Sequence, residues 1–193
     1  MDKLIKSVYN LDLTGNDVKY LTRGKSRVLL YDSITPNDDV IDLIGPTKQV
    51  LLLFPTHQGS PDGHWISIIY REETHTIFYW DSYGLSPEAE LQYSTNLKVK
   101  KNILGNLFKK AQLQGYKFEW NPYRYQKMAN GINVCGRMAS LRNRFWYLDN
   151  EQIKKLFLGQ KESPDFIVTI MTFLSLNEDE RDEEAIITQL GNV

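Results

Sequence analysis

The sequence has 193 residues but only one cysteine, Cys135. A single cysteine cannot form an internal disulfide, so a disulfide-stapled secreted domain is excluded, and so is a zinc site built from several thiolates. Free cysteines are among the most buried residue types, so a small buried side chain is the ordinary interpretation of Cys135. The alternative is a nucleophile, and the sequence around Cys135 has to decide between the two.

Charge of one sign and long apolar runs are also lacking. The net charge is −1 with 24% charged residues, which gives no overall attraction to nucleic acid or to membranes. No stretch approaches the roughly 20 apolar residues of a membrane-spanning helix, and the first residues do not resemble a signal peptide. Glycine-rich phosphate loops, dinucleotide motifs and clusters of metal ligands are missing as well. We therefore expect an intracellular protein without a cofactor or a metal ion.

The hydrophobic content of 41% suffices for one compact domain, which we expect to span residues 1–193 with an acidic tail over about 177–193. β-rich runs predict five strands, at 27–31, 49–54, 64–70, 75–80 and 116–120. Apolar residues at helical spacing, together with a capping box at Thr14 and Asp17, predict four helices, at 16–21, 96–114, 136–148 and 164–176. The predicted fold class is α+β, with a small, mostly antiparallel sheet flanked by helices.

A β-hairpin is expected to bring a histidine and an aspartate together. His64 opens the strand at 64–70, Asp81 directly follows the strand at 75–80, and the polar turn 71–74 joins the two. In an antiparallel hairpin the start of one strand lies beside the end of its partner. His64 and Asp81 should therefore be neighbours, as an imidazole–carboxylate pair requires, although Asp81 could also merely cap a turn.

Cys135 stands at the predicted start of a helix. There the helix dipole favours a thiolate, and free backbone N–H groups can bind an oxyanion. Gly136 follows directly and lets the backbone approach a substrate closely. Covalent catalysis by a thiol requires a nucleophile, a base and an acceptor that orients the base, and Cys135, His64 and Asp81 are the candidates.

The other histidines and the tryptophans have plainer interpretations. His75 is expected on the surface, whereas His57, in a loop rich in proline and glycine, could line a cleft. Trp65 and Trp80 could simply fill the core.

Four motifs occur in one order: Gly63-His64-Trp65, Trp80-Asp81-Ser82-Tyr83-Gly84, Gln126 and Val134-Cys135-Gly136. In this order they resemble the adenovirus maturation proteases and the related ubiquitin-like-protein proteases. The spacing from His64 to Asp81 and the continuation at 85–87 are also similar to those of the adenoviral enzymes. The resemblance covers about residues 14–148, is specific only around the motifs, and implies the papain-like fold of these cysteine proteases.

The resemblance also implies a role for each residue of the motifs. By it, Cys135 attacks the scissile carbonyl, His64 is the general base and Asp81 orients the histidine. The implied substrate-binding residues are Trp65, which would flank the histidine and narrow the substrate channel, and Gly136.

By the same resemblance, Gln126 helps to form the oxyanion hole, with the backbone N–H of Cys135 as the second donor. Two features depart from the family pattern. Gln126 lies nine residues before Cys135, whereas six or seven is usual in the family, so Asn130 or Asn133 could supply the donor instead. The chain also has no second cysteine for the disulfide-linked peptide that boosts the adenoviral enzyme, so any such activator must bind noncovalently.

Five lysines lie on or near the predicted helix at 96–114. A solvated helix face is the plain interpretation, and weak contact with nucleic acid is the alternative. The five are Lys98, Lys100, Lys101, Lys109 and Lys110.

The resemblance favours a cysteine endopeptidase of a virus or virophage. Such an enzyme would cleave capsid or precursor proteins beside small residues such as glycine during particle maturation, and we expect it in the virion and the infected host cell. The alternatives are a protease that processes ubiquitin-like proteins, an acyltransferase on the same fold, and a catalytically silent binding module. The acyltransferase would need a basic site for its acyl donor, and the intact catalytic motifs argue against the silent module.

Overall fold

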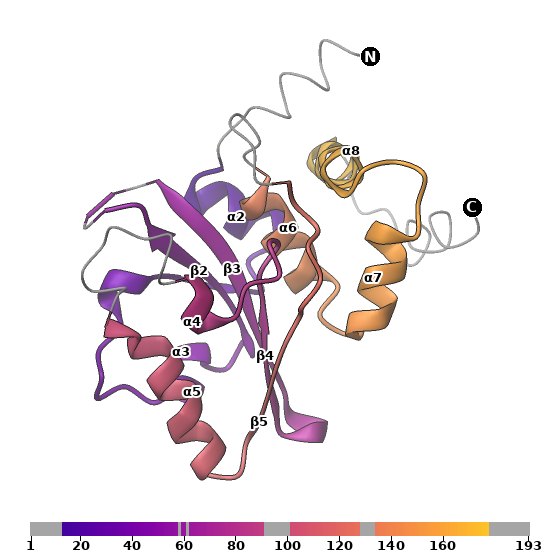
Figure 1. Cartoon of the computed structure of the whole chain (residues 1–193). Coiled ribbons are helices and arrows are strands. Elements are labelled where there is room, and N and C mark those ends of the chain that lie inside the picture. The colour runs from indigo at the N-terminus through magenta and orange to yellow at the C-terminus, as the bar shows by residue number, and fades with distance from the viewer. Residues whose placement is uncertain (1–12, 58, 61, 91–100, 128–133, 178–193) are drawn as a thin grey trace.

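The computed structural model describes residues 13–57, 59–60, 62–90, 101–127 and 134–177. Five strands form one sheet in the spatial order β1-β2-β3-β4-β5 (Figure 1). Their bounds are β1 Arg27–Leu30, β2 Gln49–Pro55, β3 Gly63–Arg71, β4 Thr76–Trp80 and β5 Lys117–Trp120. All five were expected from the sequence, and their ends agree with the prediction to about one residue.

The three central strands are antiparallel, whereas each edge strand runs parallel to its neighbour. β2 pairs with β3 and β3 with β4 in antiparallel register, with Ser67 of β3 opposite Trp80 of β4. β1 pairs with β2, and β5 with β4, in parallel register. Parallel neighbours need a crossover connection, and these connections contain α3 (Val40–Ile44) and α5 (Ile103–Leu113). The α+β class is confirmed, and the sheet is antiparallel at its centre and parallel at both edges.

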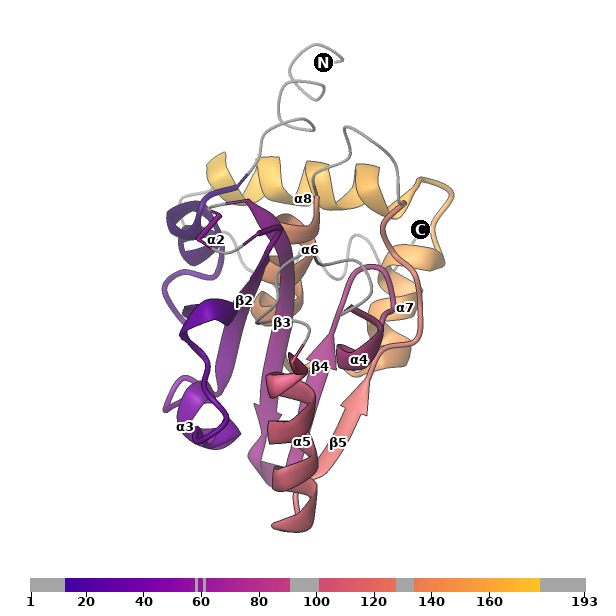
Figure 2. The same cartoon turned by 60° about the vertical axis from the view of Figure 1, so that its left-hand side comes forward.

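Helices cover both faces of the sheet, as two views 60° apart show (Figure 1 and Figure 2). On one face, α3 and α5 share a core with alternate residues of β2, among them Leu52. On the other face, α2 (Gly15–Leu21) and α6 (Cys135–Arg144) enclose Leu51 and Leu53. Successive side chains of a strand point to opposite faces, so the wholly apolar pattern of β2 follows from its two covered faces. The other helices are α4 Pro87–Glu90, α7 Asn150–Leu158, α8 Pro164–Asn177 and the 3-10 helices η1 Tyr31–Ser33 and η2 Glu72–Thr74.

Capping explains where two of the helices begin. The capping box expected at α2 is present, since the Asp17 N–H donates to Thr14 Oγ1 at 3.3 Å and the Thr14 N–H donates to Asp17 Oδ2 at 2.8 Å. α7 is missing from the predicted helices, although Asp149 and Gln152 form the same capping box at its start. α3 and α4, of five and four residues, are too short to show a helical period in the sequence.

Two predicted helices have different ends in the structure. α5 begins at Ile103, because Asn102 has a φ of 50°, a left-handed conformation that a right-handed helix cannot contain. The prediction of a helix that continues through Asn102 is therefore wrong. Residues 96–100, where the predicted helix begins, lie outside the described residues. α6 ends at Arg144 rather than at 148, where the sequence pattern had placed its end.

The predicted acidic tail lies outside the described residues beyond Asn177. In the part of the chain that the structure describes, no helix combines the length and the apolar character that crossing a bilayer requires.

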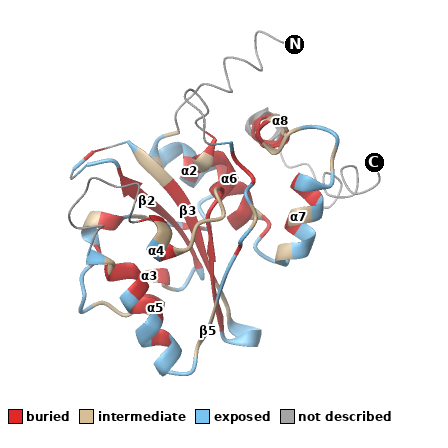
Figure 3. Ribbon diagram, in the orientation of Figure 1, coloured by how far each residue is buried: buried red, intermediate tan, exposed pale blue. Residues whose placement is uncertain are grey.

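Asn143 ties α6 to the sheet through buried polar contacts. Residues 136–143 of this helix are buried (Figure 3). The Asn143 Nδ2 atom donates to Ser26 Oγ at 2.9 Å and to the Val50 carbonyl at 3.1 Å, while its side-chain oxygen accepts a hydrogen bond from Ser67 Oγ. These contacts fix α6 along its axis, and they therefore set the position of Cys135 at its start.

We expect Asn143→Ala to lower the free energy of unfolding by roughly 3 kcal/mol, because it leaves several buried donors and acceptors without partners. Urea denaturation measures the change. Gln112→Ala, on the exposed side of α5, is the control and should change stability by less than about 0.5 kcal/mol. Equal stability of the two variants would show that the buried network does not hold α6.

Candidate active site

The pairing of β3 with β4 brings His64 and Asp81 together. His64 is the second residue of β3, and Asp81 directly follows β4. The His64 Nε2 atom lies 2.6 Å from Asp81 Oδ1, so the structure has the neighbours that the hairpin predicts. The histidine side chain is 15% exposed and the aspartate side chain is 0% exposed. The imidazole is thus the member of the pair that a substrate can reach.

The buried Asp81 carboxylate is compensated by several donors. The backbone N–H of Tyr83 donates to Oδ1 and that of Leu85 to Oδ2, each at 3.0 Å. Asn121 fixes the Asp81 backbone, because its side chain accepts from the Asp81 N–H and donates to the Asp81 carbonyl, both at 2.9 Å. Burial opposes ionisation, but His64 and the two N–H groups outweigh it and lower the pKa of Asp81.

The turn after Asp81 places an aromatic ring on the imidazole. Tyr83 stacks on His64, with ring centroids 4.8 Å apart and planes 28° from parallel. Gly84 follows with a φ of 73°, and a Cβ atom there would lie 2.9 Å from the Pro122 carbonyl oxygen. A side chain at this position would be strained and crowded, so the turn requires glycine.

Cys135 is the first residue of α6, and its thiol lies beside His64, so that each side chain affects the pKa of the other. Because Nε2 of the ring faces Asp81, Nδ1 is the nitrogen that remains for the thiol. Burial opposes ionisation of the thiol, but His64 and the backbone N–H groups of Trp65 and Gly136 outweigh it and lower the pKa of Cys135. Burial also opposes the charge on His64, yet Asp81 and Cys135 raise its pKa well above the ordinary value. Both shifts favour a thiolate–imidazolium pair.

The start of α6 is suited to an oxyanion. Val134 precedes the helix and makes no side-chain hydrogen bond to its first turn. The first N–H groups of a helix have no partner within the helix, and the dipole places partial positive charge there. The negatively charged oxygen of an intermediate bonded to the Cys135 sulfur could therefore accept hydrogen bonds from these backbone N–H groups.

Trp65 and Gly136 pack against each other beside the thiol. A Cβ atom on Gly136 would lie 3.1 Å from Trp65 Cδ1 and 3.3 Å from Val18 Cγ1. Packing against Trp65 and α2 is therefore a structural reason for glycine at position 136. Contact of Gly136 or Trp65 with a substrate stays a prediction. Trp65 is 6% exposed and lines a cavity of about 420 Å³ together with residues of β1 and β2.

Gln126 is tied to the same loop as Asp81. Its side-chain oxygen accepts a hydrogen bond from Ser82 Oγ at 2.8 Å, and its backbone N–H donates to the Ser82 carbonyl at 2.9 Å. The alternative donors, Asn130 and Asn133, lie outside the described residues. The role of Gln126 in an oxyanion hole stays a prediction.

The sequence analysis gave no role to Asn121 or Glu90. Asn121 is 40 residues away from Asp81 in the sequence, so no local motif connects the two. Glu90 comes from the short helix α4, and its Oε1 atom lies 3.4 Å from His64 Nε2. Within the described residues, the ligand atoms of His64, Asp81 and Glu90 lie within 4.8 Å of one another, close enough to hold a metal ion. The His64 Nε2 and Asp81 Oδ1 atoms already face each other in a direct hydrogen bond. We therefore interpret these three side chains as a group of interacting acids and bases rather than as metal ligands.

The two other histidines and the described members of the lysine group lie on the surface. His57 and His75 are exposed, and His75 contacts the ring of Tyr116 with centroids 5.4 Å apart. Lys109 pairs with Glu88 at 3.7 Å. The exposed members of the lysine group are Lys101, Lys109 and Lys110, and those outside the described residues are Lys98 and Lys100. Contact with nucleic acid stays a prediction.

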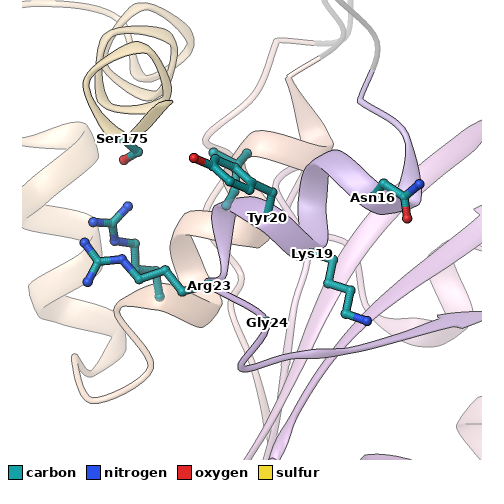
Figure 4. A pocket seen from close by; sticks show the side chains of 8 residues that line it. Asn16, Lys19, Tyr20, Arg23, Gly24 and Ser175 are labelled. Carbon is teal, nitrogen blue, oxygen red and sulfur yellow. The ribbon is translucent and has the colours of Figure 1, made fainter. Parts of the chain in front are cut away.

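A second cavity, of about 510 Å³, lies between α2, α6 and α8 (Figure 4). Lys19 of α2, Arg23 after it, Arg144 of α6 and Ser175 of α8 are among the residues that line it. Arg144 is at the opposite end of α6 from Cys135, roughly 14 Å away along the helix axis. This cationic cavity is therefore separate from the candidate active site.

Comparisons with known proteins concern the sequence and the fold of the chain. No protein-family model matches the chain. The chain is 27% identical over 176 residues to the uncharacterized protein V9 of Sputnik virophage. This alignment covers 88% of the chain and 99% of that protein. Its fold is similar to the crystal structure of the ASFV pS273R protease, with a TM-score of 0.50, 13% identity and coverage of 84% of this chain and 67% of that one. A looser similarity, with a TM-score of 0.43 and 12% identity over 89% and 80% of the two chains, extends to the C-terminal Ulp1 protease domain in complex with Smt3, the yeast ortholog of SUMO.

We expect Cys135 to react with iodoacetamide at pH values below the range of ordinary thiols, because its pKa is lowered beside His64. In His64→Ala the thiol loses this partner, and alkylation at pH 6 should slow by about tenfold or more. Cys135 is the only cysteine, so mass spectrometry reports its labelling without ambiguity. His75→Ala is the matched control and should react like the unsubstituted protein. Equal rates in both variants would contradict the ion pair.

Proposed function

We propose that this chain is a thiol endopeptidase in which Cys135 is the nucleophile, His64 the acid–base group and Asp81 the residue that orients the histidine. The observation that carries the proposal is the unbroken series of contacts from the buried Asp81 through His64 to the Cys135 thiol at the start of α6. These are the groups that covalent catalysis by a thiol requires. The similarity of the fold to a protease adds support.

In the first half-reaction, the Cys135 thiolate attacks the carbonyl carbon of the scissile peptide bond. A C–S bond forms, and the carbonyl oxygen becomes an oxyanion that accepts hydrogen bonds from backbone N–H groups at the start of α6 and from the Gln126 amide. The C–N bond then breaks as His64 gives its proton to the leaving amine. The product is a thioester on Cys135 and a free amine.

In the second half-reaction, water attacks the thioester carbonyl while the neutral His64 takes a proton from it. The C–S bond breaks, the acid product leaves, and the thiolate–imidazolium pair is restored. Asp81 stays ionised throughout and keeps Nδ1 of the ring directed at the sulfur. One water molecule is consumed for each peptide bond that is cut.

We further propose that the substrates are viral capsid or precursor proteins with small residues such as glycine beside the cut. The site of action would be the virion and the infected host cell. The similarity to a virophage protein and the fold shared with the ASFV protease support a viral setting. The preference for glycine and the role in particle maturation rest on the resemblance of the His-Trp and Cys-Gly motifs to the adenoviral maturation proteases.

Hydrolysis of internally quenched peptides with glycine on both sides of one bond tests the proposal. The unsubstituted protein should cut them at least about tenfold faster than the same peptides with leucine at those positions. Cys135→Ala should cut neither, because no thioester can form, while its circular dichroism and thermal midpoint stay the same. Hydrolysis by Cys135→Ala would show that the nucleophile is misassigned.

A peptide electrophile ending in glycine separates the alternatives. Labelling of Cys135 without turnover of any peptide would refute the endopeptidase and leave a reactive thiol. Reaction with a full-length ubiquitin-like protein electrophile, but with no peptide, would favour a processing enzyme for such modifiers.

Gln126→Ala should lower peptide turnover by about 10²–10³-fold, because an oxyanion-hole donor is lost. Cys135 and His64 remain in place, so alkylation of the thiol should persist. The contrast between the two rates is the measurement. Near-normal hydrolysis by Gln126→Ala, together with a loss in Asn130→Ala or Asn133→Ala, would assign the donor to the later loop instead.

A further inference from the structure

A second carboxyl group lies at the centre of the candidate site. Glu90 ends α4, and its Oε1 atom is 3.4 Å from His64 Nε2, the same atom that meets Asp81 Oδ1 at 2.6 Å. Glu90 is only 5% exposed, and within the described residues its Oε1 atom has no hydrogen-bond partner. A buried, unpartnered carboxyl oxygen is unfavourable, so its place against the histidine calls for an explanation.

Two charged side chains lie beside Glu90: the imidazolium of His64 and the carboxylate of Asp81. Among the described residues, the titratable groups that face it are His64 of β3, Tyr79 of β4, and Asp81 and Tyr83 of the turn that follows β4. Burial raises the pKa values of Tyr79 and Tyr83, so both hydroxyls are neutral near pH 7. Burial and then Asp81 raise the pKa of Glu90 to about 7, although His64 opposes the change.

We infer that Glu90 is a positioning residue of this site, which packs against the imidazole–carboxylate pair in its neutral form and adds a second negative charge beside His64 Nε2 when it ionises. Its catalytic consequence rests on the proposed function, whereas the contact with the histidine does not. Glu90 does not reach the reacting atoms, and it acts through His64.

The second charge changes the acid strength of the imidazolium. While Glu90 is neutral, Asp81 is the one anion beside Nε2, and the ring can release its proton to a leaving amine. Once Glu90 is ionised, two carboxylates stabilise the imidazolium, and the ring holds its proton more tightly. An opposite charge within about 4–6 Å shifts a pKa by about 1–3 units, and Glu90 is closer than that. Glu90 therefore extends the range of the imidazolium to higher pH.

Glu90→Gln tests this inference, because glutamine has the same shape and is neutral at every pH. The pKa of His64 should fall by about one unit or more in this variant, measured by NMR titration of the ring protons with EDTA present to remove metal ions. The chain has only three histidines, so the ring signals can be assigned by single substitutions. The upper inflections of Cys135 alkylation and of kcat/KM should move to lower pH by the same amount.

Glu88→Gln is the matched control. It removes the same charge from the same helix, two positions away, where Glu88 pairs with Lys109 on the surface. The pKa of His64 should change by less than about 0.3 units in this variant, because exposed charges are screened by solvent. An equal shift in both variants would overturn the inference, since it would show a general charge effect rather than the contact.

Glu90→Met provides a second neutral side chain, and the same shift of His64 is expected. An unshifted His64 in either folded Glu90 variant refutes the role of Glu90. In the unsubstituted protein, the His64 ring signals should themselves show an additional inflection near pH 7 from the ionisation of Glu90, and its absence also refutes the role. NMR and alkylation need no peptide substrate, so the expected shift without peptide cleavage would refute the endopeptidase and keep the Glu90 contact.

Discussion

A carboxylate that is sealed from water must be surrounded by donors, and Asp81 imposes this requirement on the whole candidate site. One of its oxygens, Oδ1, accepts from both the His64 ring and the Tyr83 N–H, so the orientation of the imidazole and the shape of the turn are set together. Asn121 fixes the backbone of Asp81 from a distant part of the chain. The histidine is therefore directed by a rigid, buried group rather than by a surface loop.

The nucleophile depends on a different buried element. Cys135 begins α6, whose far end is held to β2 and β3 by the polar contacts of Asn143. Near the thiol, the close approach of Gly136 to Trp65 sets how deeply the helix start lies against β3. The His64 ring is carried by the same strand as Trp65, so the distance between thiol and imidazole is determined by packing between α6 and β3. Catalytic groups on such rigid elements need little reorganisation during a reaction.

The sequence predicted the parts of the site that local patterns control. The hairpin gave the pairing of His64 with Asp81, because strand alternation and a polar turn are local signals. Local patterns could not predict that Asn121 and Glu90 belong to the site. Asn121 meets Asp81 only after β5 has crossed to the far side of β4, and α4 is too short to show any period. Long-range pairing also hid the parallel edge strands, since a strand's own residues do not reveal the direction of its partner.

The charges of the site oppose one another in their effect on stability. Asp81 has a lowered pKa, so its favourable contribution is present above its ordinary value of 3.8 and is lost as the pH falls through the lowered value. His64 has a raised pKa, so its contribution is complete below 6.5 and is lost as the pH rises through the raised value. Glu90 contributes unfavourably, because the unfolded chain loses this proton near pH 4.5 whereas the folded chain keeps it to about 7, so stability declines as the pH rises across that window. Glutamine at this position would avoid the loss, and so a titratable group that lowers stability there is easier to explain by its contact with His64 than by packing alone.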